Sequence, residues 1–188
     1  MKQRIFIAFQ VSLEMVGELE KIQEALREKN RHVRINWVKP DGFHITVQFI
    51  GDTEEKELQI VKNIFRQVVV KYNPIVFESD CISAFPNDMH PKTIIVKCFE
   101  HARASNRLQR ELTDALVNKG IAVELKKWIP HITIARNKTD QRVKGFEQIV
   151  IKPVTWTIHS IEIMASKLLP DGPEYTVLES CNLSSRTA

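Results

Sequence analysis

The pattern His44-Ile45-Thr46-Val47 returns in the second half of the chain as His131-Ile132-Thr133-Ile134. Each copy lies in a short apolar run typical of a β-strand, in which successive side chains point to opposite faces. The histidine and the threonine of a copy therefore share one face, and the branched apolar residues share the other. Two such strands facing each other would gather two imidazoles and two hydroxyls above an apolar core. The pattern thus predicts both a β-sheet and a site on it.

The repeat exceeds what chance provides in this composition. The chain contains six His and ten Thr, so roughly 0.3 His-x-Thr pairs are expected at random, and a motif match has to be discounted by that rate. Two pairs are present, each with Ile between and a β-branched apolar residue after it. Ordinary strands with a polar face are the alternative interpretation of both copies.

Length and composition indicate a soluble globular protein of one domain. The 188 residues are 43% hydrophobic and carry a net charge of +4, with an isoelectric point of about 9.0. This mild basic excess favours an anionic partner such as RNA. We expect a monomer with no obligate protein partner.

The cysteines and the N-terminal residues indicate a cytoplasmic protein. Cys81, Cys98 and Cys181 lack zinc-ligand or redox spacing, which favours reduced thiols. The apolar run from Ile5 to Phe9 is too short for a signal peptide. No segment has the length of a membrane span.

Helix and strand patterns are mixed along the chain without strict alternation, which favours an α+β fold with antiparallel sheets. We expect helices from Ser12 to about Lys29, from a capping box at Asp52 and Glu55 to about Lys71, and from about Ala102 to Lys119. The expected strands cover residues 4–9, 43–50, 75–77, 93–99, 131–134, 153–165 and 175–179, with Gly51 ending the second. A helix precedes each motif, so residues 1–188 are expected to form one bilobal domain of two similar lobes.

Two imidazoles in one site can divide the work of acid–base catalysis. One accepts a proton from the nucleophile and the other gives a proton to the leaving oxygen. The threonine hydroxyls can donate hydrogen bonds to phosphate oxygens as charge builds in the transition state. The motifs contain no carboxylate or thiol, so no metal is implied, and a two-histidine zinc site shared between them is the alternative.

The two motifs resemble those of the two-histidine phosphoesterases, and more narrowly of the RNA 2′,3′-cyclic phosphodiesterases, also described as 2′-5′ RNA ligases. The flanks are similar too, in chain order. They are Arg4-Ile5-Phe6-Ile7-Ala8, Trp37-Val38-Lys39-Pro40-Asp41-Gly42-Phe43, Phe49-Ile50-Gly51, Ala84-Phe85-Pro86, Ile129-Pro130 with Ala135-Arg136 around the second motif, and Gly172-Pro173-Glu174-Tyr175.

This resemblance implies a bilobal α+β fold with a central groove and hydrolysis of RNA 2′,3′-cyclic phosphate ends to 2′-phosphates, without metal or other cofactor. It makes His44 the proton donor to the leaving 3′ oxygen and His131 the acceptor that activates water. Thr46 and Thr133 would bind the phosphate. The residues themselves do not distinguish the two histidine roles. The reversed chemistry would make the protein a 2′-5′ RNA ligase.

Four further residues are candidates for the site. Strict alternation places Arg136 on the core face, where a charge is costly unless paired. Either the strand bends before Arg136, which then binds phosphate or RNA, or Arg136 forms a structural ion pair. Phe43, Trp37 and Phe85 are candidates for base stacking, with core packing as the alternative.

Two other functions fit the same motifs. One is a cyclic phosphodiesterase for a small nucleotide or for 2′-5′ oligoadenylate. The other is a non-catalytic RNA-binding module, which would bind RNA without turnover.

Overall fold

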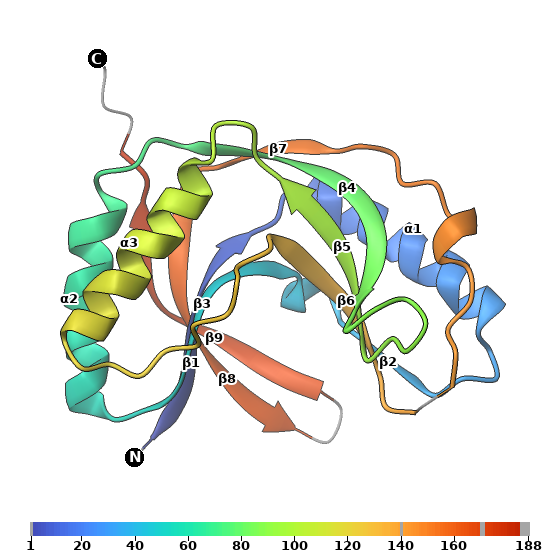
Figure 1. Cartoon of the computed structure of the whole chain (residues 1–188), viewed down its shortest axis with the longest axis horizontal. Coiled ribbons are helices and arrows are strands. Elements are labelled where there is room, and N and C mark those ends of the chain that lie inside the picture. The colour runs from blue at the N-terminus through green and yellow to red at the C-terminus, as the bar shows by residue number, and fades with distance from the viewer. Residues whose placement is uncertain (1, 140, 170–171, 185–188) are drawn as a thin grey trace.

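Nine antiparallel strands form one curled sheet in the computed structural model, which describes residues 2–139, 141–169 and 172–184 (Figure 1). The strands are β1 (Gln3–Gln10), β2 (Ile35–Trp37), β3 (His44–Thr53), β4 (Ile75–Phe85), β5 (Thr93–Phe99), β6 (His131–Asn137), β7 (Thr155–Ile158), β8 (Ser160–Leu169) and β9 (Gly172–Asn182). Their order is β7-β4-β5-β6-β3-β1-β8-β9, and β2 pairs with β6. With helices outside this sheet, the predicted α+β class is confirmed.

Within the described ranges, three α-helices accompany the sheet: α1 (Leu13–Lys29), α2 (Glu55–Val69) and α3 (Ala104–Asn118). The Ser12 hydroxyl accepts a hydrogen bond from the Met15 amide at 3.2 Å and so caps α1 as predicted. Short 3₁₀ turns cover Pro40–Gly42 and Phe146–Gln148. In Figure 1, α2 and α3 lie together at one end of the molecule and α1 lies at the other.

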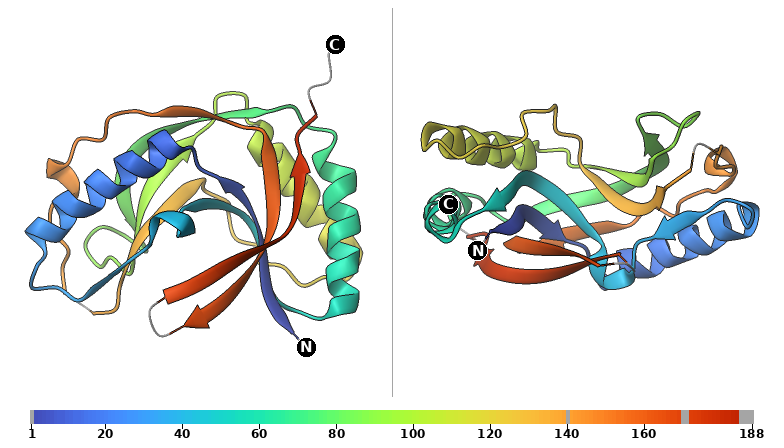
Figure 2. Two further views of the ribbon diagram at one scale, coloured as in Figure 1. Left: turned by 180° about the vertical axis from the view of Figure 1, so that it is seen from behind. Right: turned by 90° about the horizontal axis from the view of Figure 1, so that it is seen from below.

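The sheet has two halves that meet where β3 lies beside β6. One half contains β7, β4, β5 and β6, and the other contains β3, β1, β8 and β9. The pair Ile45–Ile132 joins them. The view from below in Figure 2 shows β4 and β5 above and β8 and β9 below, so the sheet curls between the two halves.

The two faces of the sheet differ in character. One face carries a continuous core that includes Ile5, Ile7 and Phe9 of β1 and the buried stripe of α1. The other, which we call the open face, carries His44, Thr46, His131 and Thr133 and a small apolar cluster. That cluster consists of Phe6, Ala8 and Met164, with Phe49 and Tyr175 packed against it.

Several predicted boundaries are wrong, each for a local reason. Strand β3 passes Gly51 and ends at Thr53, because Gly51 adopts a φ of 93° beside a register shift on β1. The capping box of α2 is formed by Glu54 and Glu57, two residues later than predicted. The strand expected at 75–77 continues to Phe85.

The single strand expected over residues 153–165 is two strands that divide at His159. Strand β7 pairs with β4 and strand β8 pairs with β1, so the two pieces belong to opposite halves of the sheet. The alternation of apolar and polar residues breaks at this point, because neither His159 nor Ser160 is buried, whereas Ile158 and Ile161 on either side of them are. The sequence therefore carries a sign of the division that the predicted single strand overlooks.

Candidate active site

The register of β3 against β6 assembles the two motifs. Ile45 lies opposite Ile132 in an antiparallel pair, and both side chains are fully buried in the core. One step along this register in either direction places His44 beside Thr133 and Thr46 beside His131, with all four side chains on the open face. The two halves of the sheet thus each contribute one imidazole and one hydroxyl to the same place.

Each imidazole is held by the carbonyl oxygen of the residue two positions earlier. His44 Nδ1 lies 2.8 Å from the Gly42 oxygen, and His131 Nδ1 lies 2.7 Å from the Ile129 oxygen. A carbonyl only accepts hydrogen bonds, so Nδ1 carries the proton in both neutral rings. The Nε2 atom of each ring therefore presents a lone pair and can accept or, once protonated, donate a proton.

Aromatic rings surround His44 on the open face. Its ring centroid lies 4.9 Å from that of Phe6 and 5.2 Å from that of Tyr175, which meets it edge to face. A Cβ atom on Gly42 would come within 3.3 Å of the Tyr175 ring, so the glycine lets Tyr175 approach the motif. The pKa of His44 is lowered to about 4, mainly by burial among these groups, with a contribution from the positive charges of His131 and Arg136 and against the hydrogen bond to the Gly42 carbonyl.

His131 has a similar but less enclosed environment. The Phe85 ring meets it edge to face at a centroid distance of 5.0 Å. Burial lowers the pKa of His131 and Arg136 adds to the effect, whereas the hydrogen bond to Ile129 opposes it. Both histidines are therefore neutral in the ligand-free protein at neutral pH, with Nε2 unprotonated.

The two threonines are half-buried on the open face. In the part of the chain that the structure describes, neither hydroxyl has a hydrogen-bond partner, so both are free to bind a ligand. The backbone of Thr46 is fixed from outside the motif, because Trp128 Nε1 donates a hydrogen bond to its carbonyl at 2.8 Å.

Arg136 also reaches the open face, because β6 carries a bulge. Ile95 pairs with Thr133 but the preceding residue, Ile94, pairs with Ala135, so the alternation shifts by one residue within β6. Arg136 is exposed, and its guanidinium lies 3.4 Å from the Thr93 hydroxyl. Among the described residues it makes no salt bridge, which leaves it available for an anion.

The three aromatic candidates lie in different places. Phe85 lies against His131 on the open face. Phe43 is 2% exposed and belongs to the core. Trp37 packs against the core, and the Arg27 guanidinium of α1 lies 5.0 Å from its ring centroid. The structure therefore does not bring Phe43 or Trp37 to the site.

Sequence reasoning missed Phe6, Tyr175 and Trp128. Phe6 lies in the unbroken apolar run of β1, where alternation of polar and apolar residues gives no sign of which side faces the site. Tyr175 comes from a segment far from either motif. Trp128 lies three residues before the second motif, but its hydrogen bond is to the backbone of the first, and only the tertiary fold brings the two together. Nothing in the local sequence distinguishes them from ordinary packing residues.

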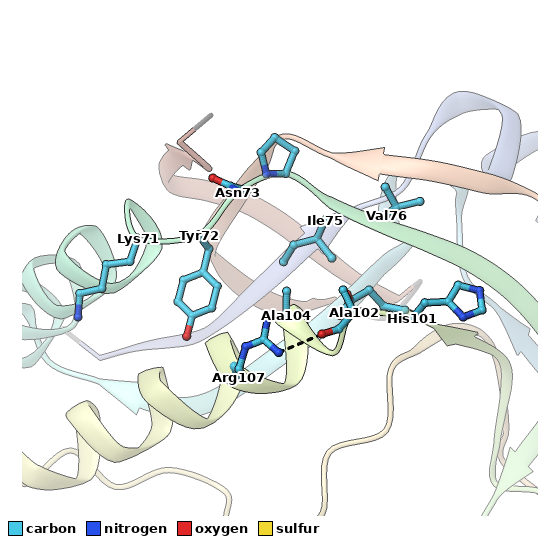
Figure 3. Close-up of a pocket in the computed structure, with 11 residues that line it drawn as sticks. Lys71, Tyr72, Asn73, Ile75, Val76, His101, Ala102, Ala104 and Arg107 are labelled. Carbon is cyan, nitrogen blue, oxygen red and sulfur yellow. Dashed lines mark hydrogen bonds between the residues drawn. The ribbon is translucent and has the colours of Figure 1, made fainter. Parts of the chain in front are cut away.

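A hollow of about 550 Å³ lies away from the two motifs, between the end of α2 and the start of α3 (Figure 3). Its lining includes Lys71, Tyr72 and Arg107. Lys71 and Tyr72 both bind Glu111, and Arg107 donates to the Ala102 carbonyl at 3.0 Å. Since these polar groups bind within the protein, the hollow offers no converging set of groups for a ligand.

Among the described residues, no group of three or more His, Cys, Asp or Glu side chains is placed to hold a metal ion. Within the same residues, no helix has the length and apolar character needed to cross a membrane.

Proteins of known sequence and structure resemble this chain over nearly its whole length. The RNA 2′,3′-cyclic phosphodiesterase of Thermotoga maritima is 29% identical over 180 residues, which cover 95% of this chain and 94% of that protein. The enzyme of the same name from Aquifex aeolicus is 28% identical over 183 residues, or 94% of this chain and 95% of that protein.

Solved structures share the fold. A protein of Thermus thermophilus superposes with a TM-score of 0.81 at 24% identity and covers 98% of this chain and 100% of that one. Escherichia coli LigT complexed with 3′-AMP superposes with a TM-score of 0.77 at 17% identity, covering 98% of this chain and all of LigT. The sequence profile of LigT-like phosphoesterases matches residues 11–96 and 99–175. This chain therefore belongs to the LigT-like phosphoesterase family.

Proposed function

We propose that this phosphoesterase hydrolyses the 2′,3′-cyclic phosphate at the 3′ end of RNA to a 2′-phosphate, with His44 and His131 as acid and base. The observation that carries the proposal is the pair of imidazoles on one face, each with Nδ1 bound to a carbonyl and Nε2 left free. The relatives named RNA 2′,3′-cyclic phosphodiesterase support the choice of substrate.

The proposed reaction transfers one proton at each histidine. His131 Nε2 takes a proton from water as the water oxygen bonds to phosphorus. The bond from phosphorus to the 3′ oxygen breaks, and protonated His44 Nε2 gives its proton to that oxygen. Thr46 and Thr133 donate to the non-bridging oxygens, and the Arg136 guanidinium offsets their negative charge. The product is a 2′-phosphate beside a free 3′ hydroxyl.

The negative charge of the substrate accounts for the proton that His44 must carry in this mechanism. A proton donor must be protonated, yet burial is the main cause that lowers the pKa of His44 to about 4. The cyclic phosphodiester carries one negative charge, and an anion beside an imidazole raises its pKa. His44 is therefore expected to gain its proton together with the substrate. Both rings have the same hydrogen bond to a carbonyl, so the assignment of donor and acceptor follows the family resemblance.

The same site would support ligation. If the 5′ hydroxyl of a second RNA replaces water, His131 accepts its proton and the 5′ oxygen bonds to phosphorus. The 3′ oxygen leaves with the proton of His44, and a 2′-5′ linkage remains. No co-reactant is needed, because the ring opening of the cyclic phosphate drives the step.

The test is hydrolysis of a short RNA that ends in a 2′,3′-cyclic phosphate, in EDTA, with the product identified by ³¹P NMR. Wild type should give the 2′-phosphate. His44→Asn and His131→Asn should each lose about 10²- to 10⁴-fold in kcat/KM. Asparagine is the matched substitution, since its amide nitrogen takes the place of Nδ1 and keeps the carbonyl bond.

Four outcomes would contradict the proposal. A 3′-phosphate product would reverse the leaving group, and loss of activity in EDTA with rescue by zinc would replace acid–base catalysis by a metal. Binding of RNA without turnover by folded wild type would indicate the RNA-binding module. Equal turnover of 2′,3′-cyclic AMP and the short RNA would favour a small-nucleotide substrate.

A further inference from the structure

Two segments carry a strong local excess of positive charge. Residues 27–39 contain five Lys or Arg and one Glu, and residues 136–144 contain four Lys or Arg and one Asp. Together they carry a net charge of +7, whereas the whole chain carries +4. The rest of the protein is therefore net acidic, and the positive charge is much stronger in these two segments than the net charge of the chain suggests.

The fold brings the two segments together at one end of the open face. Strand β2 pairs with the last residues of β6, where Asn36 lies opposite Arg136. Farther out, Asn30 and the Lys144 backbone exchange two hydrogen bonds of 2.8 Å. In Figures 1 and 2, the connection after α1 and the segment after β6 lie side by side at the end of the molecule away from α2 and α3.

Alternation within the paired strands directs the basic side chains outward. Asn137 is buried and Arg136 and Lys138 are exposed on either side of it. Ile35 and Asn137 are the last pair of the two strands, and Arg34 and Lys138 are the residues that adjoin this pair on their two segments. Successive outward residues are about 6.8 Å apart along a strand. A row of positive groups thus continues outward from Arg136, which itself belongs to the proposed site.

In the part of the chain that the structure describes, these basic groups have no acidic partner. Within the described residues, Arg34, Lys138 and Arg142 make no salt bridge, and all three are exposed. Like charges side by side on neighbouring strands destabilise a sheet. A ligand with negative charges at regular intervals, such as a nucleic acid backbone, would neutralise the repulsion between these positive side chains.

We infer that Arg34 and Lys138, with Arg142 beyond them, form a track for the backbone of single-stranded RNA that leads out of the active site past Arg136. This inference rests on the proposed function and specifies its substrate class. A cyclic phosphate occupies the 3′ end of its strand, so every other phosphate of the substrate lies on the 5′ side. The track therefore binds the nucleotides that precede the reacting one, and the preferred substrate is an oligonucleotide.

The test compares 2′,3′-cyclic AMP with a pentanucleotide ending in a 2′,3′-cyclic phosphate. The track variant is Arg34→Glu with Lys138→Glu, and Arg34→Ala with Lys138→Ala is a milder version for use if charge reversal disturbs folding. The matched control is Lys56→Glu with Arg110→Glu, two exposed helical residues on α2 and α3. Both glutamate pairs change the net charge equally.

We expect the track variant to raise KM for the pentanucleotide on the order of tenfold, while KM for cyclic AMP and every value of the control stay as in wild type. The plot of log kcat/KM against log salt for the pentanucleotide should become shallower by about 1.4, at about 0.7 for each phosphate contact of a single strand.

The inference is overturned if the track variant raises KM equally for both substrates. It is also overturned if the control raises KM for the pentanucleotide as much as the track variant does, or if the track variant changes KM for neither substrate. Failure of the proposed function has a separate signature, which is no turnover of either substrate by folded wild type. In that case, the affinity for a labelled pentanucleotide, measured by fluorescence anisotropy, still tests the track. Weaker binding by the track variant alone supports the track, and equal binding by all variants refutes it.

Discussion

Lowering the pH should destabilise the folded protein through His44. The native environment holds the pKa of this imidazole at about 4, mainly by burial, against 6.5 for an unperturbed histidine. Between these two values the unfolded chain binds a proton that the folded protein excludes. Stability is therefore complete above pH 6.5 and falls as the pH decreases from 6.5 to about 4.

The magnitude follows from the two pKa values. A full pKa unit corresponds to about 1.4 kcal/mol, so protonation of the unfolded state alone lowers the free energy of unfolding by about 2 kcal/mol at pH 5 relative to pH 7.5. His131 contributes in the same direction, since burial also lowers its pKa.

Urea unfolding of wild type and His44→Asn, each at pH 7.5 and pH 5, isolates the His44 contribution. The variant keeps a hydrogen bond to the Gly42 carbonyl but has no group that titrates in this range. Between pH 7.5 and pH 5, we expect the free energy of unfolding to fall by about 2 kcal/mol more for wild type than for the variant. Equal losses would show that His44 titrates normally in the folded protein and would refute the role given to Phe6 and Tyr175.

Thr46→Val and Thr133→Val should each lower kcat about 10²-fold with an unchanged urea midpoint, since neither hydroxyl has a partner among the described residues; a shifted midpoint would indicate a structural role. Arg136→Ala removes a positive charge that lowers the pKa of both histidines, so the acid limb of the kcat/KM profile should move to higher pH. Arg136→Lys should leave that limb in place, and a limb that moves equally in both variants would argue against a charge effect. Tyr175→Ala should raise the pKa of His44 from about 4 towards 6.5 by exposing its ring, as followed by NMR titration; an unmoved pKa would assign the burial to other groups.

The candidate residues of the motifs could be predicted because strand alternation is a local property. His44 and Thr46 share a face wherever the strand lies, and the same holds for His131 and Thr133. The α+β class was equally accessible, because helix and strand periods are local patterns. The pairing of β3 with β6 is a tertiary feature, and only the repeat of the motif suggested it.

What could not be predicted depends on contacts between distant segments. Arg136 lies on the open face because β6 bulges against β5, and a bulge leaves no mark in the sequence of one strand. Phe6 and Tyr175 enclose His44 because β1 and β9 lie in the same half of the sheet. Phe43 and Trp37, which are as aromatic as Phe85, pack on the core side instead.

The pairing of Ile45 with Ile132 also bears on errors of folding. If β3 slipped by one residue against β6, one isoleucine would leave the core and an imidazole would have to enter it. The cost of that exchange falls on the whole hydrophobic core. A misregistered chain is therefore unstable and unfolds again. Burial of the core thus selects the one register that also aligns the active-site residues. Molecules that fold at all will fold with His44 beside Thr133 and with Thr46 beside His131.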